Sequence, residues 1–350
     1  MGKKSETLRW FSLPLLMVFI FIGLGEIATR GLGLVDRANG FPRKLFAPSD
    51  NPALGYEMRQ NLKAMVRGVS VRTNALGFRG PEVTLPKPEG IRRVLLLGDS
   101  VTFGYRMAEP MIFPTLLREH LQLRPNEHWD IVNLGVEGYN TAAQEIVLQQ
   151  VGLALQPDVV ILAFNLNDYD TMPAVGPRGV LTLNPEGTRS PWSPAHIPEF
   201  YLLLEWIGKT GGRIWFGGPT AEPNADDAPF EDLDIYVSAL RKAYWRNPTD
   251  QRLAHVQTSL RQMQARLQQR GIPFLVVILP DGDQVGVSTP DLSPQQRMAI
   301  ICHAENLRCL DLLPAFVAEP QKRLFMDIMH PNPAGHRIIA REIAQQLVAP

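Results

Sequence analysis

The sequence predicts an α/β protein built on one parallel sheet. Short runs rich in Val, Ile and Leu, such as VLLLG at 94–98 and DVVILAFN at 158–165, are typical of strands buried on both faces. Amphipathic segments such as FPTLLREHLQL at 113–123 follow these runs. Strands that alternate with helices favour a parallel sheet covered by helices on both sides.

Five segments are predicted strands of this sheet, connected by right-handed crossovers: VLLLG (94–98), DIVNLG (130–135), DVVILAFN (158–165), PFLVVILP (273–280) and CLDLLPAF (309–316). The predicted helices are residues 113–123, a stretch ending at Gln150, and residues 250–270, 294–306 and 336–349.

We divide the chain into an N-terminal segment (1–30), an irregular collar (31–90) and a main domain (91–350). The collar is dense in Gly, Pro, Asn and Arg, and MVRGVSVRTN at 65–74 predicts one hairpin. A Pro/Gly-rich insertion interrupts the main domain at about 169–233.

The insertion holds one apolar island, EFYLLLEWIGK at 199–209, with Phe200, Leu203, Leu204 and Ile207 on one helical face. We expect this face to border the substrate cleft, because the insertion leaves the sheet at the edge where ligands bind. Packing of the same face against the core is the alternative.

The N-terminal segment resembles a targeting signal. Lys3, Lys4 and Arg9 precede an uncharged apolar run from Trp10 to Gly25. The run is longer than a usual signal-peptide core and shorter than the roughly 20 residues of a spanning helix. We expect an uncleaved signal anchor with its basic end in the cytoplasm and the rest outside. A cleaved signal peptide is the alternative.

Composition excludes several function classes. The 350 residues include 35 Lys plus Arg and 35 Asp plus Glu, so no cationic field favours nucleic acid. Residues 98–104 lack the GxGxxG pattern and no GK[ST] follows them, so no nucleotide phosphate site is predicted. No cluster of Cys, His, Asp or Glu has metal-ligand spacing. We therefore expect no cofactor and no metal. Cys302 and Cys309 form a disulfide or remain two buried thiols.

A serine, Ser100, directly follows the first predicted strand. A serine nucleophile needs a base, a group that orients the base, and donors for the oxyanion. The carboxyl ends of parallel strands meet at one edge. Asp327 and His330 follow the last predicted strand, three residues apart, before a helix for which Asn332 is the predicted N-cap and Pro333 the first residue.

Four short motifs, in this order, resemble the four blocks of the SGNH (GDSL-type) hydrolases. They are GDSVTFG (98–104), the glycine of VNLGVEGYN (132–140), NLND (165–168) and DIMHP (327–331). The resemblance implies a three-layer α/β/α flavodoxin-like fold with a five-stranded parallel sheet. It covers roughly Arg92 to the C-terminus, without the insertion.

The resemblance implies a role for each matching residue. Ser100 is the nucleophile, His330 the base and Asp327 its orienter. The oxyanion hole consists of the backbone N–H groups of Ser100 and Gly138 and the side chain of Asn167. Gly135 is the alternative to Gly138.

Four further polar residues are expected to shape or support the site rather than to react. The family commonly has glycine where this chain has Asn165, whose side chain we expect to narrow or polarise the substrate pocket. Asp99 and Asp168 are expected to brace loops through nearby backbone N–H groups. His336 lies within the last predicted helix and is expected to be structural.

The predicted function is a membrane-anchored, extracytoplasmic serine esterase that forms an acyl-enzyme at Ser100. The stretch RTNALGFRG at 72–80 resembles the N-terminal extension of bacterial envelope members of the family, which suggests glycan or lipid esters as substrates. An O-acyltransferase to a polysaccharide hydroxyl would use the same residues. A non-catalytic module that binds envelope glycan or a partner is the third possibility.

Overall fold

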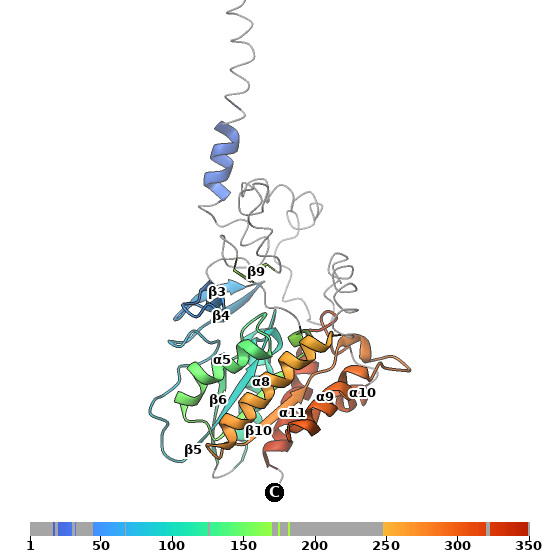
Figure 1. Cartoon of the computed structure of the whole chain (residues 1–350). Helices are drawn as coiled ribbons and strands as arrows, with labels where there is room; N and C mark the ends of the chain where they lie inside the picture. Colours follow the sequence, from blue (N-terminus) through green and yellow to red (C-terminus); the bar gives the residue numbers. More distant parts are fainter. Residues whose placement is uncertain are drawn as a thin grey trace, which may run out of the picture.

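The computed structural model contains an α/β domain with additional strands before it (Figure 1). It describes residues 17, 20–29, 32, 45–66, 68–124, 127–169, 174–175, 181–182, 248–319 and 323–348. Most of the apolar run at 10–25 and the apolar island at 199–209 lie outside the described residues.

Five parallel strands form the central sheet, as predicted. In spatial order they are β11 (Arg308–Asp311), β10 (Phe274–Ile278), β7 (Val159–Phe164), β5 (Ile91–Gly98) and β6 (His128–Asn133). The chain starts at β5, adds β6 on one side and then returns to add β7 on the other. This is the flavodoxin-like order, and its switch point between β5 and β7 is where such sheets bind ligands.

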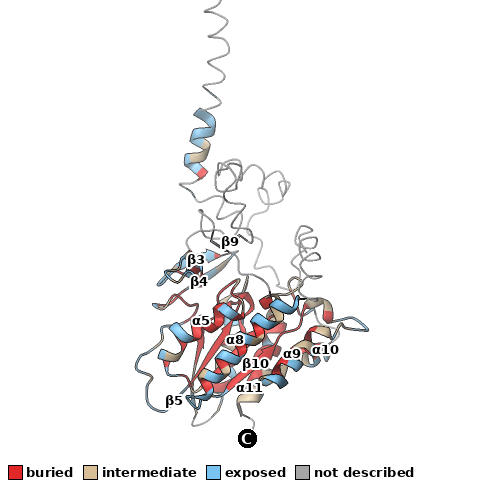
Figure 2. Cartoon of the chain, in the orientation of Figure 1, coloured by how far each residue is buried: buried red, intermediate tan, exposed pale blue. Residues whose placement is uncertain are grey.

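Helices cover both faces of the sheet, so the domain has three layers. Successive residues of β5 point to opposite faces: Leu95 and Leu97 pack in one core cluster, and Val94 and Leu96 in the other. The first cluster includes buried residues of α5 (Thr141–Gln150), α8 (Asp250–Gln268) and α9 (Ser293–Ala304). The second includes those of α4 (Phe113–Gln122), α10 (Leu313–Val317) and α11 (Pro333–Val348). Figure 2 shows the buried strands between these helices.

Short elements connect the layers at the edges of the sheet. They are α3 (Ser100–Phe103), η1 (Glu109–Met111), η2 (Gly152–Leu155), η3 (Leu166–Tyr169) and η5 (Gly282–Gln284). Helices α3 and η3 directly follow the two strands at the switch point, β5 and β7. The side chains of these two connections therefore meet where a ligand would bind.

The collar is more regular than predicted. β3 (Lys63–Val66) and β4 (Val69–Arg72) form the expected antiparallel hairpin. A second antiparallel pair, β1 (Phe46–Pro48) with β2 (Tyr56–Met58), precedes it. Its buried residues belong to the same core cluster as α5 and α8. Outside the collar, at the start of the predicted insertion, β8 (Ala174–Val175) and β9 (Leu181–Thr182) form another short antiparallel pair.

The last predicted strand is shorter than expected. β11 ends at Asp311, whose Oδ1 accepts a hydrogen bond from the backbone N–H of Leu313 at 2.9 Å. Pro314 then lies in the first turn of α10, where its missing N–H costs nothing. The segment 309–316 is therefore half strand and half helix, because the aspartate and the proline redirect the chain.

The two cysteines, for which the sequence leaves two states open, form a disulfide. Cys302 in α9 and Cys309 in β11 have Cα atoms 6.3 Å apart, within the usual range for a bridge. The bond connects an outer strand of the sheet to the helix that precedes it.

Among the helices within the described ranges, none combines the length and the apolar character needed to cross a bilayer.

Candidate active site

Ser100 lies at the sharp turn between β5 and α3. Asp99 is the N-cap of α3, and its Oδ1 accepts from the backbone N–H of Val101 at 2.9 Å, as predicted for a bracing carboxylate. A Cβ at Gly98 would lie 2.0 Å from Thr102 Oγ1, so only glycine permits this close return of the chain. The turn places Ser100 at the carboxyl end of β5, beside the switch point.

The structure brings Ser100, His330 and Asp327 into one chain of hydrogen bonds. Ser100 Oγ lies 3.0 Å from His330 Nε2, and His330 Nδ1 lies 2.7 Å from Asp327 Oδ2. The imidazole can accept the hydroxyl proton at Nε2 while its Nδ1–H donates to the carboxylate. These are the positions that the sequence predicts for a nucleophile, a base and its orienter.

The Asp327 carboxylate is held in its ionised form. Its Oδ1 accepts from the backbone N–H groups of Met329 at 2.9 Å and His330 at 2.8 Å. Burial alone would raise the pKa of Asp327, but the charge and hydrogen bonds of His330 and the bond from Met329 outweigh it and lower the pKa to about 2. The carboxylate is therefore a fixed acceptor for His330 at neutral pH.

The loop that carries His330 is anchored at both sides. Asn332 caps α11, because its Oδ1 accepts from the N–H groups of Ala334 at 2.9 Å and Gly335 at 3.1 Å, and this confirms the predicted cap. The backbone N–H of Gly282 donates to the Ile328 carbonyl at 2.6 Å. His330 therefore sits on a loop tied to two neighbouring elements.

An aromatic ring that sequence reasoning missed lies against the histidine. The rings of Tyr105 and His330 stack, with centroids 4.0 Å apart and planes 13° apart. The backbone N–H of Tyr105 donates to the Ser100 carbonyl at 3.0 Å, so one turn carries both residues. An aromatic residue five positions after a serine is no signal by itself, because only the fold brings His330 to it.

The two candidate glycines have different surroundings. Gly138 has a φ of +80°, in the left-handed region, and is partly exposed. A Cβ at Gly135 would lie 2.6 Å from the backbone nitrogen of Phe103 and 2.7 Å from Thr102 Cβ, so this glycine lets the β6–α5 loop pack on α3. Among the described residues, the N–H groups of Ser100 and Gly138 have no hydrogen-bond acceptor. These contacts favour Gly138 as the oxyanion donor.

Asn167 and Asn165 both interact with the buried Asp99 carboxylate. Burial raises the pKa of Asp99, and hydrogen bonds from Val101, Asn167 and Ser100 oppose the shift. An amide NH₂ has two hydrogens, so Asn167 can donate to Asp99 and still offer one to an oxyanion. Asn165 Nδ2 lies 3.3 Å from Asp99 Oδ2, and its Oδ1 accepts from Leu166 N–H at 2.8 Å. The Asn165 side chain is buried inside the loop, so it does not narrow a substrate pocket as expected.

Asp168 connects the two loops that carry Gly138 and Asn167. Its Oδ2 accepts from Thr141 Oγ1 at 3.2 Å, and its Oδ1 lies 3.5 Å from Gln144 Nε2. Burial and then the Asp99 carboxylate raise the pKa of Asp168 well above its ordinary value. Asp168 therefore braces loops as expected, but its main donors are side chains rather than backbone N–H groups.

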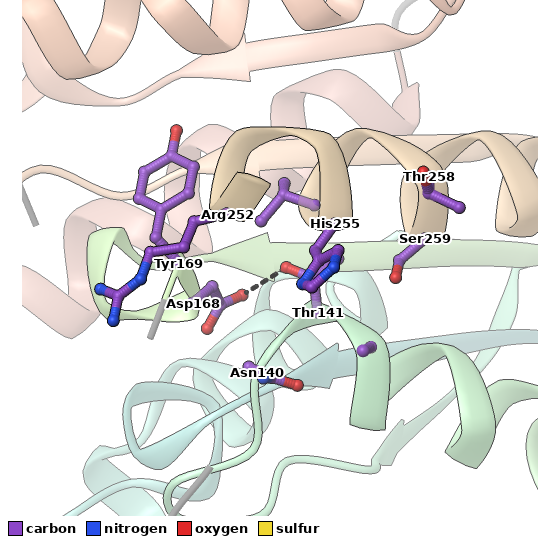
Figure 3. A pocket seen from close by; sticks show the side chains of 10 residues that line it. Asn140, Thr141, Asp168, Tyr169, Arg252, His255, Thr258 and Ser259 are labelled. Carbon is purple, nitrogen blue, oxygen red and sulfur yellow. Dashed lines mark hydrogen bonds between the residues drawn. The ribbon is translucent and has the colours of Figure 1, made fainter. Parts of the chain in front are cut away.

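A pocket of about 270 Å³ lies beside Asp168, between η3 and the first turns of α5 and α8 (Figure 3). Eight of its lining residues carry polar groups: Asn140, Thr141, Asp168, Tyr169, Arg252, His255, Thr258 and Ser259. Ala142 and Val256 complete it. In the figure, Thr141 and Asp168 face each other across the gap between α5 and η3.

His336 has a structural contact, as expected. It is buried in α11, and its Nδ1 accepts from the backbone N–H of Phe113 at 3.0 Å, which connects α11 to the start of α4. Burial, with the charges of His330 and Arg79, lowers the pKa of His336 to about 3, so the ring is neutral.

No group of three or more His, Cys, Asp or Glu side chains suited to a metal ion occurs in the described parts of the chain.

A parallel α/β sheet with Ser, His and Asp hydrogen-bonded in series at its carboxyl edge has the arrangement of a serine hydrolase. The chain belongs to the GDSL-like lipase/acylhydrolase family, whose family model matches residues 96–338. It is therefore a carboxylic ester hydrolase of this family.

Solved structures with a similar chain course include several esterases. The acetyl xylan esterase AlAXEase is 16% identical, with a TM-score of 0.44 over 73% of this chain and 100% of its own. Axe2, an acetylxylan esterase from Geobacillus stearothermophilus, is 14% identical, with a TM-score of 0.44 over 74% and 95%. TesA is 13% identical, with a TM-score of 0.42 over 74% and 100%. No curated protein matches the chain.

Proposed function

We propose that this ester hydrolase acts through an acyl-enzyme at Ser100. The observation that carries the proposal is the series of hydrogen bonds from Ser100 Oγ through His330 to Asp327. A base 3.0 Å from the hydroxyl is within reach of the proton that must leave as the hydroxyl attacks.

The proposed reaction has two halves. Ser100 Oγ attacks the ester carbonyl carbon while its proton moves to His330 Nε2. The carbonyl oxygen becomes an oxyanion that accepts from the N–H groups of Ser100 and Gly138 and from the Asn167 amide. The intermediate then expels the alcohol, which takes the proton from His330. Water repeats the sequence on the acyl-enzyme, releases the carboxylic acid and returns the proton to Ser100.

The pocket beside Asp168 supports a proposal for where part of the ester lies. Asp168 directly follows Asn167, and Asn140 lies two residues after Gly138, so the pocket adjoins both loops of the proposed oxyanion hole. Hydroxyl, amide, imidazole and guanidinium groups among its lining residues could hydrogen-bond a polar alcohol, such as a sugar of an envelope glycan. We therefore propose an acylated glycan as the substrate class.

We also propose that the hydrolase domain lies outside the cytoplasm, anchored through residues 1–30. Lys3, Lys4 and Arg9 before the apolar run support this orientation. The disulfide supports it as well, because such bonds persist mainly in oxidising compartments. A reporter enzyme fused after residue 30 should remain in the membrane fraction with the reporter outside. Release of a mature protein that begins near residue 26 would replace the anchor with a cleaved signal peptide.

The acyl-enzyme proposal is tested by intact-mass analysis after incubation with a fluorophosphonate and with a short-chain nitrophenyl ester. The wild type should gain one phosphonyl group on Ser100 and should hydrolyse the ester, whereas Ser100→Ala should do neither. Labelling at another residue, or hydrolysis by Ser100→Ala at the wild-type rate, would overturn the proposal. Transfer of the acyl group to an added polysaccharide in preference to water would make the enzyme an acyltransferase.

A further inference from the structure

We propose that the collar is part of the catalytic apparatus, and that Arg79 and Tyr56 are positioning residues for the nucleophile and the oxyanion hole. Both residues precede the family match at 96–338, and both contact loops of the proposed site. The inference rests on the proposed function of Ser100.

Arg79 holds the C-terminal end of the helix that begins with Ser100. Its Nη1 donates to the carbonyls of Phe103 at 3.1 Å and Gly104 at 2.7 Å, and its Nη2 donates to the Met107 carbonyl at 2.6 Å. Carbonyls at a helix end have no partner within the helix, and a cation there is favourable. One side chain from the collar thus satisfies three carbonyls at the C-terminal end of α3 and in the turn that follows it.

This turn is bonded directly to the catalytic residues. The N–H groups of Gly104 at 2.9 Å and Tyr105 at 3.0 Å donate to the Ser100 carbonyl. Tyr105 in turn stacks on His330. A shift of the carbonyls that Arg79 holds would therefore move the nucleophile and the ring packed against its base.

The burial of Arg79 is costly, which argues for a requirement beyond stability. The side chain is 1% exposed, and its three hydrogen-bond acceptors are backbone carbonyls rather than a carboxylate. Burial lowers the pKa of Arg79 to about 10, against the opposing charges of Glu109 and Glu137, so the guanidinium stays protonated at neutral pH. Lysine cannot replace it, because a single ammonium lacks the planar fork that reaches several acceptors at once.

Tyr56 braces the other loop. Its hydroxyl donates to the Glu137 carbonyl at 2.6 Å, next to Gly138, and its own carbonyl accepts from the hydroxyl of Tyr139. The rings of Tyr56 and Tyr139 pack edge to face with centroids 5.1 Å apart. Gly138, the proposed donor, thus lies between two residues fixed by one collar tyrosine.

Arg93 on β5 is a matched control for Arg79, because it is a second buried arginine. It is fully buried and makes three hydrogen bonds, to Asp130 Oδ2 at 2.7 Å and to the carbonyls of Leu155 at 2.6 Å and Thr84 at 2.9 Å. It lies near the amino end of β5, however, whereas Ser100 follows the carboxyl end. Loss of Arg93 should therefore affect stability without touching the site.

The test compares Arg79→Lys, Tyr56→Phe and Arg93→Lys in the full chain, each assayed at the same interval below its own Tm. Nitrophenyl ester kinetics give kcat and KM, and mass analysis gives the rate of fluorophosphonate labelling. Because small misplacements of reacting groups are costly, Arg79→Lys should lower kcat and labelling about 10- to 100-fold, and Tyr56→Phe about tenfold, with little change in KM. Arg93→Lys should lower Tm while kcat stays within about twofold of the wild type.

The outcomes separate this inference from the proposed function. A wild-type enzyme that is not labelled at Ser100 would refute the proposed function. A labelled wild type with unchanged kcat in both Arg79→Lys and Tyr56→Phe would refute the positioning roles alone. Equal losses of kcat in Arg79→Lys and Arg93→Lys would show a general loss of stability and would also refute them. If Arg79→Lys does not fold, Tyr56→Phe, which keeps the buried ring, decides the question.

Discussion

The buried His336 should make the protein sensitive to acid. Its ring is 1% exposed, and its Nδ1 accepts from Phe113 N–H, so protonation of that nitrogen would remove the acceptor and bury a charge. His336→Asn is the informative change, because asparagine offers Oδ1 as a neutral acceptor that does not titrate. We expect the variant to lose the acid sensitivity that the histidine confers.

The magnitude follows from the pKa of His336, which is lowered from 6.5 to about 3 on folding. Between these values the unfolded chain binds a proton that the folded chain does not, so the free energy of unfolding falls as pH falls. The full shift corresponds to about 4 to 5 kcal/mol, at about 1.4 kcal/mol for each pH unit. This loss of free energy of unfolding is absent above about pH 6.5 and is complete near pH 3.

Urea unfolding at intervals from pH 7 to pH 4 measures the effect. At pH 7, His336→Asn should be less stable than the wild type by about 1 to 2 kcal/mol, because the smaller side chain leaves a cavity. The stabilities should cross between about pH 5 and 6, and below this the variant should be more stable. His120→Asn, at an exposed position in α4, is the control and should follow the wild type at every pH. A constant difference between wild type and His336→Asn would refute the reasoning.

Three further predictions concern the site. Ser100→Ala should abolish ester hydrolysis apart from a residual rate of about 10³ to 10⁴ over water, with an unchanged circular dichroism spectrum. In nitrophenyl ester assays Asp327→Asn should retain more activity than His330→Ala, because it disturbs the orientation and tautomer of the base without removing it, and equal activities would contradict these roles. Ala142→Trp, which fills the rim of the pocket, should raise KM for an acetylated oligosaccharide more than for a nitrophenyl ester. Gln149→Trp, on the same helix and away from the pocket, should change neither, and an unchanged KM in Ala142→Trp would remove the pocket from the substrate site.

The sheet could be predicted from the sequence because its central strands are almost uninterrupted runs of aliphatic residues. β7 and β10 are buried along their whole length, and this leaves a clear pattern in the sequence. The positions of Ser100, His330 and Asp327 could be predicted because each follows a predicted strand in a short motif. Local pattern and topology together were sufficient for these features.

The features that could not be predicted depend on contacts between distant segments. Nothing near Arg79 in the sequence indicates that it donates to carbonyls 24 to 28 residues later, and Tyr56 contacts Glu137 across 81 residues. β1 and β2 have three residues each, too short for a periodic pattern. The expectation that Asn165 narrows the pocket fails because the direction of a loop side chain is set by partners distant in the sequence, here Asp99.

The disulfide determines how an outer strand of the sheet behaves under reducing conditions. β11 has only four residues, and among the strands of the described ranges it pairs with β10 alone, so it is an outer strand whose other side could pair with a strand from another molecule. The bond to Cys302 closes a short chain segment, which in the loop-entropy description is worth roughly 2 to 3 kcal/mol. Handling the protein with thiol reagents should therefore loosen this strand first and promote self-association through it, long before the buried central strands separate.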